Sequence, residues 1–188
     1  MRTRHRKFRA LGLVGAAGAM YVLAVRGALT LDLRVGRRLR PLGPIRMTID
    51  APPDVVFDVI SSPYLGRTPR AMEGKVEVLE RGSDMVLAAH RTPVHRRLTA
   101  VTVETVRFTR PERVDFFLVR GPVPEVVERF TLTAEGTDTV LAYDGHLGTD
   151  LWRIGALWGN AVAAPWERSV AGTFAAVKAE AERRSGSH

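Results

Sequence analysis

The chain has 188 residues, with 28 Lys and Arg against 20 Asp and Glu, and it contains no cysteine. The lack of cysteine excludes disulfides, thiolate nucleophiles and Cys-based zinc or iron–sulfur sites. Residues 1–40 hold ten basic residues and one acidic residue, whereas residues 41–188 are almost neutral. Because the positive charge is confined to one end of the chain, we expect no nucleic-acid partner for the folded body.

An uncharged, largely apolar stretch at residues 10–25 interrupts the basic end of the chain. As a helix it would be about 24 Å long, and the hydrocarbon core of a bilayer is ~30 Å thick. Residues 27–31 continue its apolar character. We therefore predict a basic flank at 1–9, a transmembrane or membrane-associated helix at 10–31 and a basic linker at 32–44. A cleaved secretory signal and a helix packed on the domain are alternatives, and the basic residues on both flanks leave the orientation undetermined.

The rest of the chain is typical of one domain, at residues 45–184, followed by a disordered tail at 185–188. The first strand is predicted at 45–50, where apolar and polar residues alternate. Two prolines and an aspartate then predict the start of a helix over 52–60. The next segment, 61–70, contains two prolines and a glycine, which predicts a broken region with at most a turn of helix.

Six further strands are predicted from alternating or β-branched runs that are separated by turn residues. They cover residues 75–80, 85–90, 98–108, 114–120, 126–133 and 139–147. From residue 151 to 184 the apolar residues follow a helical period, and Asp150 or Thr149 is suited to cap that helix. Successive hairpins followed by one amphipathic helix indicate an antiparallel sheet that curves around the helix and leaves an apolar hollow.

Two parts of the sequence resemble the SRPBCC superfamily, which includes START-like and polyketide cyclase/dehydrase-like proteins. They are the opening segment 45–60, with Ala-Pro-Pro-Asp at its centre, and the closing helix with Trp152, Trp158 and Trp166. The resemblance implies an α+β helix-grip fold, in which about seven strands wrap around a long C-terminal helix. Here an apolar N-terminal helix would precede it. Proteins of this superfamily bind lipids, sterols, hormones or polyketides in a cavity, and some catalyse cyclisation or dehydration.

The sequence offers no catalytic, metal or cofactor motif. His90 and His95 are separated by a loop-like segment, which does not match the spacing of zinc ligands. A nucleophile elbow and a phosphate-binding glycine loop are both lacking. We therefore predict no metal and no cofactor, and the catalytic residues, if any, stay unknown.

Strand alternation does predict polar groups inside the hollow. Glu128 and Tyr143 fall on the inward faces of neighbouring strands, where a buried carboxyl group has a raised pKa and can orient a ligand hydroxyl. The alternative is a structural pair between Glu128 and an internal arginine, such as Arg107 or Arg120. The predicted lining of the cavity comprises Glu128, Tyr143, Phe116, Phe130, His90, Trp152 and Trp158. Arg67 and Arg70 are candidates for its entrance.

We therefore predict a membrane-anchored domain that binds a hydrophobic or amphipathic small molecule, lipid-like or polyketide-like. One alternative is a cyclase or dehydratase in which Glu128 and Tyr143 form an acid–base pair. Another is a non-enzymatic interaction domain whose cavity is filled by its own side chains. A single-pass membrane location is expected, with the domain on the cytoplasmic side because proteins of the superfamily are mostly intracellular. The oligomeric state and the ligand are not predicted.

Overall fold

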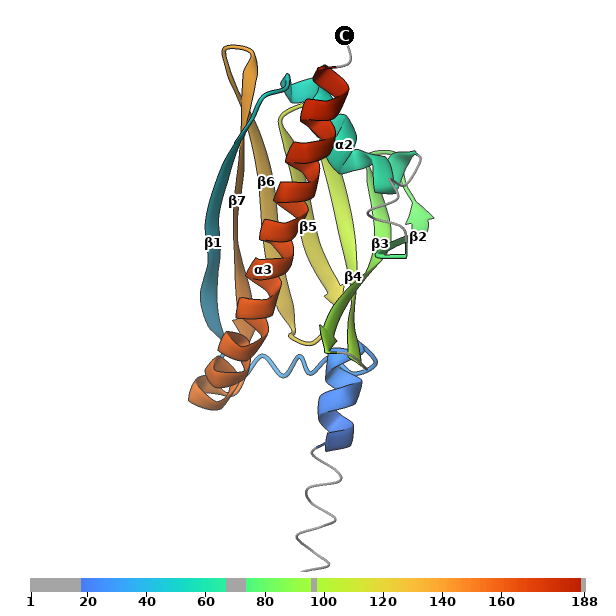
Figure 1. Ribbon diagram of the computed structural model, residues 1–188. Helices are drawn as coiled ribbons and strands as arrows, with labels where there is room; N and C mark the ends of the chain where they lie inside the picture. Colours follow the sequence, from blue (N-terminus) through green and yellow to red (C-terminus); the bar gives the residue numbers. More distant parts are fainter. Residues whose placement is uncertain (1–17, 67–73, 96–97, 187–188) are drawn as a thin grey trace, which may run out of the picture.

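The computed structural model describes residues 18–66, 74–95 and 98–186. Seven antiparallel strands form one curved sheet, and two helices lie on the same side of it (Figure 1). Its elements are β1 (Arg38–Ile49), α2 (Pro53–Leu65), β2 (Val76–Arg81), β3 (Met85–His95), β4 (Leu98–Thr109), β5 (Arg113–Arg120), β6 (Glu125–Glu135), β7 (Asp138–Thr149) and α3 (Trp152–Ser185). The strand order is β1-β7-β6-β5-β4-β3-β2. The predicted α+β class with a seven-stranded sheet and a long C-terminal helix is confirmed.

Strand β1 begins at Arg38, earlier than the predicted start at Ile45. Its first part pairs with the end of β7, and the register shifts between Leu42 and Ile45. The glycine and prolines of this stretch favoured a linker in the sequence, whereas the structure accommodates them at the irregularity. Gly43 has a φ of +78°, and a side chain there would meet the backbone and ring of Tyr143.

Helix α2 runs on to Leu65, so the prediction of a broken region from residue 61 is wrong for residues 61–65. Pro63 lies inside the helix and cannot donate a hydrogen bond to the carbonyl group one turn earlier. The Ser62 hydroxyl donates instead to that carbonyl, at 2.9 Å from the Val59 oxygen. A local side-chain donor therefore compensates for the proline.

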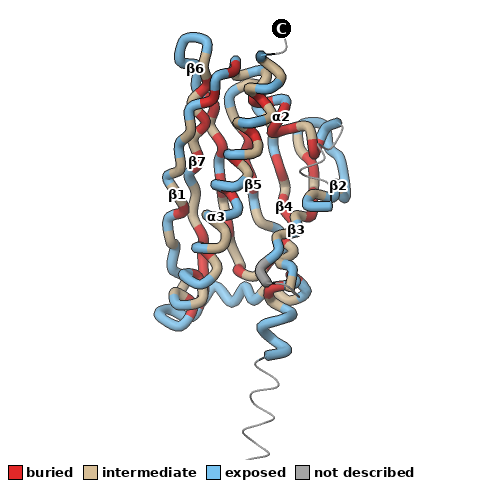
Figure 2. The backbone as a smooth tube through the Cα atoms, viewed as in Figure 1, coloured by how far each residue is buried: buried red, intermediate tan, exposed pale blue. Residues whose placement is uncertain are grey.

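Helix α3 lies lengthwise across the sheet and packs against β1, β7 and α2 (Figure 1). Toward its end the buried stripe consists of Val170, Phe174, Val177 and Ala181. Toward its beginning the buried positions are Gly155, Gly159 and Ala163, which let the helix backbone approach the sheet closely. Buried residues follow the inner positions of the central strands, whereas the first turns of α3 are mainly exposed (Figure 2).

The segment before β1 differs from the predicted helix at 10–31. Residues 10–17 lie outside the described residues, and residues 18–25 are helical. The helix ends before Gly27, which has a φ of +64°, so the prediction that it continues to Leu31 is wrong. In the part of the chain that the structure describes, no helix has the length and apolar character needed to cross a membrane.

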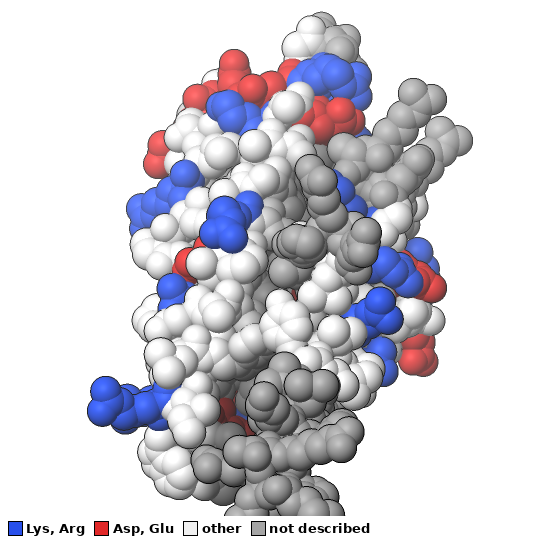
Figure 3. Space-filling view, turned by 60° about the horizontal axis from the view of Figure 1, so that its bottom comes forward, with Lys and Arg blue, Asp and Glu red and all other residues white. Residues whose placement is uncertain are grey.

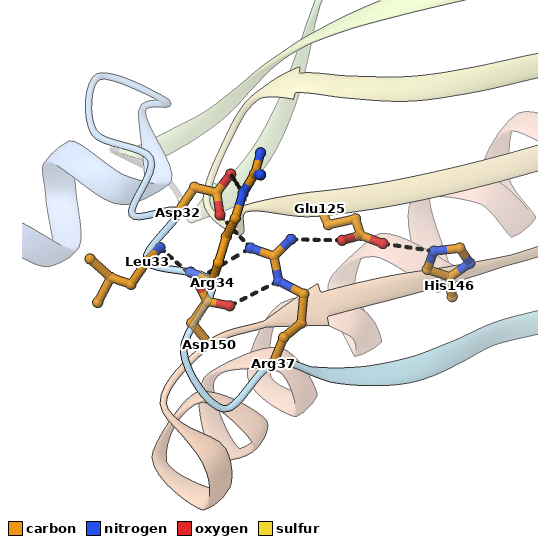
Figure 4. A network of polar contacts seen from close by, with 7 residues as sticks. All are labelled: Asp32, Leu33, Arg34, Arg37, Glu125, His146 and Asp150. Atoms are coloured by element: carbon orange, nitrogen blue, oxygen red, sulfur yellow. Dashed lines mark hydrogen bonds and ion pairs between the residues drawn. The ribbon is translucent and has the colours of Figure 1, made fainter.

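Residues 28–37 instead cross the lower end of the sheet and are held there by polar contacts (Figure 4). The Asp150 carboxylate accepts hydrogen bonds from the backbone N–H groups of Leu33 and Arg34, at 2.7 and 2.9 Å. Arg37 bonds the same carboxylate and also Glu125, which in turn contacts His146. Asp150 therefore fastens this segment and does not cap α3, whose N-cap residue is Leu151.

Candidate functional site

A buried carboxyl group sits between the sheet and α3. Glu128 is only 6% exposed, and Tyr143 beside it is fully buried. The Tyr143 hydroxyl and the Trp166 indole N–H both donate to Oε1 of Glu128, each at 2.6 Å. One oxygen of Glu128 thus joins β6, β7 and α3.

The pairing of β6 with β7 explains this arrangement. Glu128 lies opposite Gly145, and Phe130 lies opposite Tyr143, so the Tyr143 ring reaches Glu128 diagonally across the two strands. A Cβ atom at Gly145 would lie 2.3 Å from the carbonyl oxygen of Val127 and 3.0 Å from the Glu128 Cα. The glycine therefore permits the close approach of the two strands beside Glu128.

A second polar cluster lies on the inner side of β3 and β4. The His90 ring has its Nε2 atom 2.8 Å from the Tyr64 hydroxyl of α2. Its Nδ1 atom is 3.1 Å from Oε2 of Glu104, a carboxyl group that is 5% exposed. The Thr102 hydroxyl donates to the other oxygen of Glu104 at 2.6 Å. Tyr64, His90 and Glu104 therefore form a continuous row of polar groups.

Aromatic rings lie between the two clusters. The ring of Phe116 is 6.3 Å from each of Tyr64 and His90 and 5.0 Å from Phe130. Phe130 in turn contacts Tyr143 at 5.8 Å. Tilted and edge-on contacts of this kind are favourable for aromatic pairs. The site therefore combines two polar clusters with a continuous aromatic surface.

The surroundings of Glu128 raise its pKa to about 7. Burial is the main cause, because a charged carboxylate is poorly solvated in the core, and repulsion by the Glu104 carboxylate adds to it. The hydrogen bonds from Tyr143 and Trp166 offset part of this effect. Near neutral pH, Glu128 is therefore present in both its protonated and its ionised form.

The pKa values of His90 and Glu104 are shifted in opposite directions, as is expected for two groups that attract each other. Burial by itself lowers the pKa of His90, but the nearby Glu104 and Glu128 carboxylates outweigh it, so the pKa lies above its usual value. Burial raises the pKa of Glu104, yet His90 and the Thr102 hydroxyl lower it below its usual value. The proximity of the two groups therefore favours the protonated ring of His90 and the ionised carboxylate of Glu104.

Burial also raises the pKa of both tyrosines, and the neighbouring carboxylates add to the effect. Tyr64 and Tyr143 therefore stay protonated at physiological pH and serve as hydroxyl donors. Glu128 can give or take a proton, and the protonated form of His90, which its surroundings favour, donates from Nε2. The site thus offers hydrogen-bond donors at two places on an aromatic surface and one group that titrates near neutral pH.

The structure brings together five of the seven residues predicted to line the cavity, namely Glu128, Tyr143, Phe116, Phe130 and His90. Trp152 and Trp158 lie elsewhere, near the start of α3. Trp152 is 56% exposed, and Trp158 donates from its indole N–H to the Pro122 carbonyl group. Trp152 therefore lies on the surface at the lower end, whereas Trp158 is partly buried and packs against the core. Arg67 and Arg70, predicted at the entrance, lie outside the described residues.

The alternative prediction, that an internal arginine pairs with Glu128, was wrong. Arg107 pairs with Asp84 at 3.3 Å, on the outer side of the sheet, while Tyr143 and Trp166 hold Glu128. Sequence reasoning also missed Tyr64 and Glu104. Two signals in the sequence indicated that these side chains are buried: the apolar neighbours of Tyr64 in the helix and the strand alternation around Glu104. Their contact with His90 depends on the register of β3 and β4, which the sequence does not reveal.

A separate depression lies on the outer face of β6 and β7. It has a volume of about 230 Å³ and is lined by Val127, Glu128, Arg129, Asp144, Gly145 and His146. Small-molecule sites usually have volumes of about 300–1,000 Å³. This depression is therefore smaller than such a site.

No family model and no curated protein matches the sequence. Solved structures do match the fold. The protein TTHA0849 from Thermus thermophilus aligns with a TM-score of 0.60 and 16% identity, over 78% of this chain and 99% of that one. The Zhui aromatase/cyclase from Streptomyces sp. R1128 aligns with a TM-score of 0.61 and 19% identity, over 78% and 96%.

The di-domain ARO/CYC BexL from the BE-7585A biosynthetic pathway aligns with a TM-score of 0.56 and 16% identity, over 80% of this chain and 50% of that one. At such identities the likeness concerns the fold, and function has to be argued from the site. The chain therefore shares the helix-grip fold with these solved structures.

Proposed function

We propose that the protein binds an amphipathic small molecule, lipid-like or polyketide-like, between the sheet and its two helices. The observation that supports this most directly is the presence of two buried carboxyl groups, Glu104 and Glu128, in an aromatic core. Burying an ionised group costs on the order of several kcal/mol, so stability alone would favour apolar residues at these positions. Groups of this kind are useful where they meet the hydroxyl or carbonyl groups of a ligand.

Glu128 supplies the central polar contact in this proposal. Both hydrogen bonds described for Glu128 end on Oε1, which leaves Oε2 for a ligand. In the protonated form Oε2 donates to a ligand carbonyl group, and in the ionised form it accepts from a hydroxyl group. The rings of Phe116 and Phe130 then pack against the apolar part of the ligand.

A cyclase or dehydratase activity is the second candidate, favoured by the row Tyr64–His90–Glu104. In an aldol-type cyclisation, a base removes a proton from a carbon beside a carbonyl group, and this carbon attacks a second carbonyl group of the same chain. An acid then protonates the new alkoxide oxygen. Ionised Glu128 suits the role of base, and charged His90 or Tyr64 suits that of acid.

A fluorescence titration with hydrophobic and polyketide-like compounds tests the binding proposal. Trp166 donates to Glu128, so its emission reports on ligand at this site. We expect Glu128→Gln to weaken binding of a hydroxyl- or carbonyl-bearing ligand roughly tenfold, the effect of one hydrogen bond to a charged group. Glu135→Gln, at the exposed end of the same strand, is the matched control. Equal affinities of the two variants would contradict the proposal.

The enzyme candidate has a test of its own. A synthetic compound with several β-keto groups is incubated with the protein, and cyclised products are measured by mass spectrometry. Dehydration would appear as the loss of water. Cyclising activity of the wild type that disappears in both Glu128→Gln and His90→Gln would support catalysis. Binding of the compound without any cyclised product would contradict the enzyme candidate.

Attachment of residues 10–25 to a membrane is also a proposal, and it is supported by the uncharged, largely apolar character of this stretch between two basic flanks. Reporters fused to each end of the chain test it. A single span places the two reporters on opposite sides of a membrane. Reporters on the same side would contradict a span.

A further inference from the structure

Among the described residues, most of the large apolar side chains that are exposed lie at one end of the molecule. In Figure 1 it is the lower end, where residues 18–39 and the first turns of α3 lie. Ile154 is 74% exposed, Leu157 72% and Trp152 56%. We call the surface formed by residues 18–39 and 151–157 the apolar end. Exposed apolar patches of this kind mark sites of interaction in soluble proteins.

The apolar end is built into the fold. The Thr30 hydroxyl donates to the carbonyl group of Gly121 at 2.8 Å and accepts from its N–H group at 3.0 Å. The Tyr21 ring meets the Trp158 ring edge-on, with centroids 5.8 Å apart, which joins the helical residues 18–25 to α3. The backbone N–H of Trp152 donates to the carbonyl group of Gly36. The exposed apolar side chains are therefore held on one surface.

The first turns of α3 show why this surface lacks a partner inside the chain. Ile154 and Leu157 point away from the sheet, because Gly155 and Gly159 occupy the buried side of the same turns. Apolar residues on the outer side of a helix gain nothing from the core. Their burial is favourable only when another apolar surface or a lipid phase covers them.

Basic residues surround the apolar end. Arg26, Arg38 and Arg153 are exposed, and the Arg34 side chain is 82% exposed although it lies 3.6 Å from Asp32. The acidic groups Glu125 and Asp150 are bound to Arg37. In Figure 3, which turns the lower end toward the viewer, the visible described residues at the lower left are mainly uncharged, with basic side chains at their edge. The preceding sequence, residues 1–9, adds five basic residues.

We propose that the apolar end docks onto the surface of a bilayer that contains anionic lipids. Trp152, Ile154 and Leu157 would enter the boundary between headgroups and acyl chains, and the surrounding arginines would contact lipid phosphates. Tryptophan and arginine favour this boundary because each has an apolar part and a polar end. A second copy of the chain fits less well, since a two-fold contact would bring the same arginines together. This inference does not depend on what the core binds.

Tryptophan quenching by brominated phosphatidylcholine tests the contact in the full chain. The protein is bound to vesicles of equal parts phosphatidylcholine and phosphatidylglycerol, with and without bromine on the acyl chains. We expect quenching in the wild type and a clear loss of quenching in Trp152→Phe. Trp158 and Trp166, both part-buried, are present in wild type and variant and serve as internal references, so the loss of quenching is assigned to Trp152. Equal quenching of both proteins, or vesicle-bound protein without quenching, would overturn the proposal and leave attachment to residues 1–31.

Vesicle flotation of charge variants gives a second readout. Ile154→Glu should weaken binding to these vesicles roughly tenfold, because an apolar side chain that would enter the bilayer is replaced by a charge that anionic lipid repels. Leu79→Glu is the matched control, since Leu79 is 48% exposed and lies on β2, away from the apolar end. Circular dichroism verifies the fold of each variant, and Leu157→Glu replaces Ile154→Glu if that variant does not fold.

Light scattering without lipid tests whether a second copy of the chain covers the apolar end instead. A monomeric wild type is expected. A wild-type dimer that Ile154→Glu converts to a monomer would identify the apolar end as a subunit interface and contradict membrane docking. Equal vesicle binding by Ile154→Glu and Leu79→Glu would contradict it as well.

Discussion

Glu128 shows what the sequence can and cannot say about a single residue. Strand alternation placed Glu128 and Tyr143 on the inner faces of β6 and β7, and the structure confirms that both are buried. The partner of Glu128 could not be derived, because it depends on the pairing of strands and on the rotation of α3. The contact of His90 with Glu104 was missed for the same reason, since a shift of one residue between β3 and β4 would separate them.

The raised pKa of Glu128 predicts a specific pH dependence of stability. The group titrates near 4.5 in the unfolded chain and near 7 in the folded one, so the folded state binds more protons between these values. This contribution to stability is present below about pH 4.5 and is lost as the pH rises to about 7. In Glu128→Gln, the free energy of unfolding should fall less between about pH 5 and about pH 8, by roughly 2 to 3 kcal/mol at 1.4 kcal/mol per pKa unit. Urea unfolding of both proteins at a series of pH values measures this difference.

The exposed variant Glu135→Gln should keep the wild-type pH dependence. If Glu128→Gln has the same pH dependence as the wild type, the pKa of Glu128 is not raised in the folded protein.

The ion pair of His90 with Glu104 predicts a change in titration. Glu104→Gln removes the negative charge 3.1 Å from His90, so the pKa of His90 should fall because burial then dominates. Proton NMR of the imidazole ring measures this shift. Asp144→Asn, on the outer face of β7, should leave the His90 titration unchanged. An unchanged His90 titration in Glu104→Gln would show that the two groups do not interact.

At the scale of elements, the pairing of β6 with β7 depends on small residues at the points of closest approach. Most strands and both long helices were predicted near their observed places, because their apolar periodicity is strong. The errors lie where tertiary contacts override a local signal. Residues 38–44 join the sheet despite two prolines, and α2 passes Pro63 with the help of Ser62. Neither contact can be seen in the local sequence.

Two glycine substitutions separate close packing from backbone flexibility. Gly145→Ala should destabilise the protein by about 1 to 3 kcal/mol, because its Cβ would lie 2.3 Å from the Val127 oxygen. Gly172→Ala should stabilise it by up to about 1 kcal/mol, since this helical position has open space around it and alanine favours a helix. Thermal unfolding measures both. A neutral Gly145→Ala would contradict the close approach of β6 and β7.

The attachment of residues 28–37 depends on the Asp150 carboxylate. Hydrogen bonds from Arg37 and from the backbone of Arg34 and Leu33 lower the pKa of Asp150 to about 2. Asp150→Ala should speed hydrogen exchange at the amides of Leu33 and Arg34, which mass spectrometry of the corresponding peptide detects. By the same linkage, this contribution to stability is lost as the pH falls toward about 2.

Asp138→Ala, at the first residue of β7, is the control and should leave exchange at residues 28–37 unchanged. Slow exchange of this segment in Asp150→Ala would show that other contacts hold it.

For the whole molecule, the order of strands and helices was enough to predict a sheet that curves around a long C-terminal helix. Hairpin spacing sets an antiparallel order, and one amphipathic helix can bury its stripe only against that sheet. The course of the N-terminal segment could not be derived in this way. Its apolar residues favoured one continuous helix over 10–31, whereas in the structure residues 28–37 bind the lower end of the domain through Thr30, Asp150 and Arg37.

A crystal structure of the protein grown with a bound hydroxyl- or carbonyl-bearing ligand tests the central claim most directly. We expect density for the ligand between the sheet and helices α2 and α3, in contact with Phe116 and within hydrogen-bond distance of Oε2 of Glu128. Density there for the protein's own side chains alone, with the ligand elsewhere or unbound, would contradict the claim.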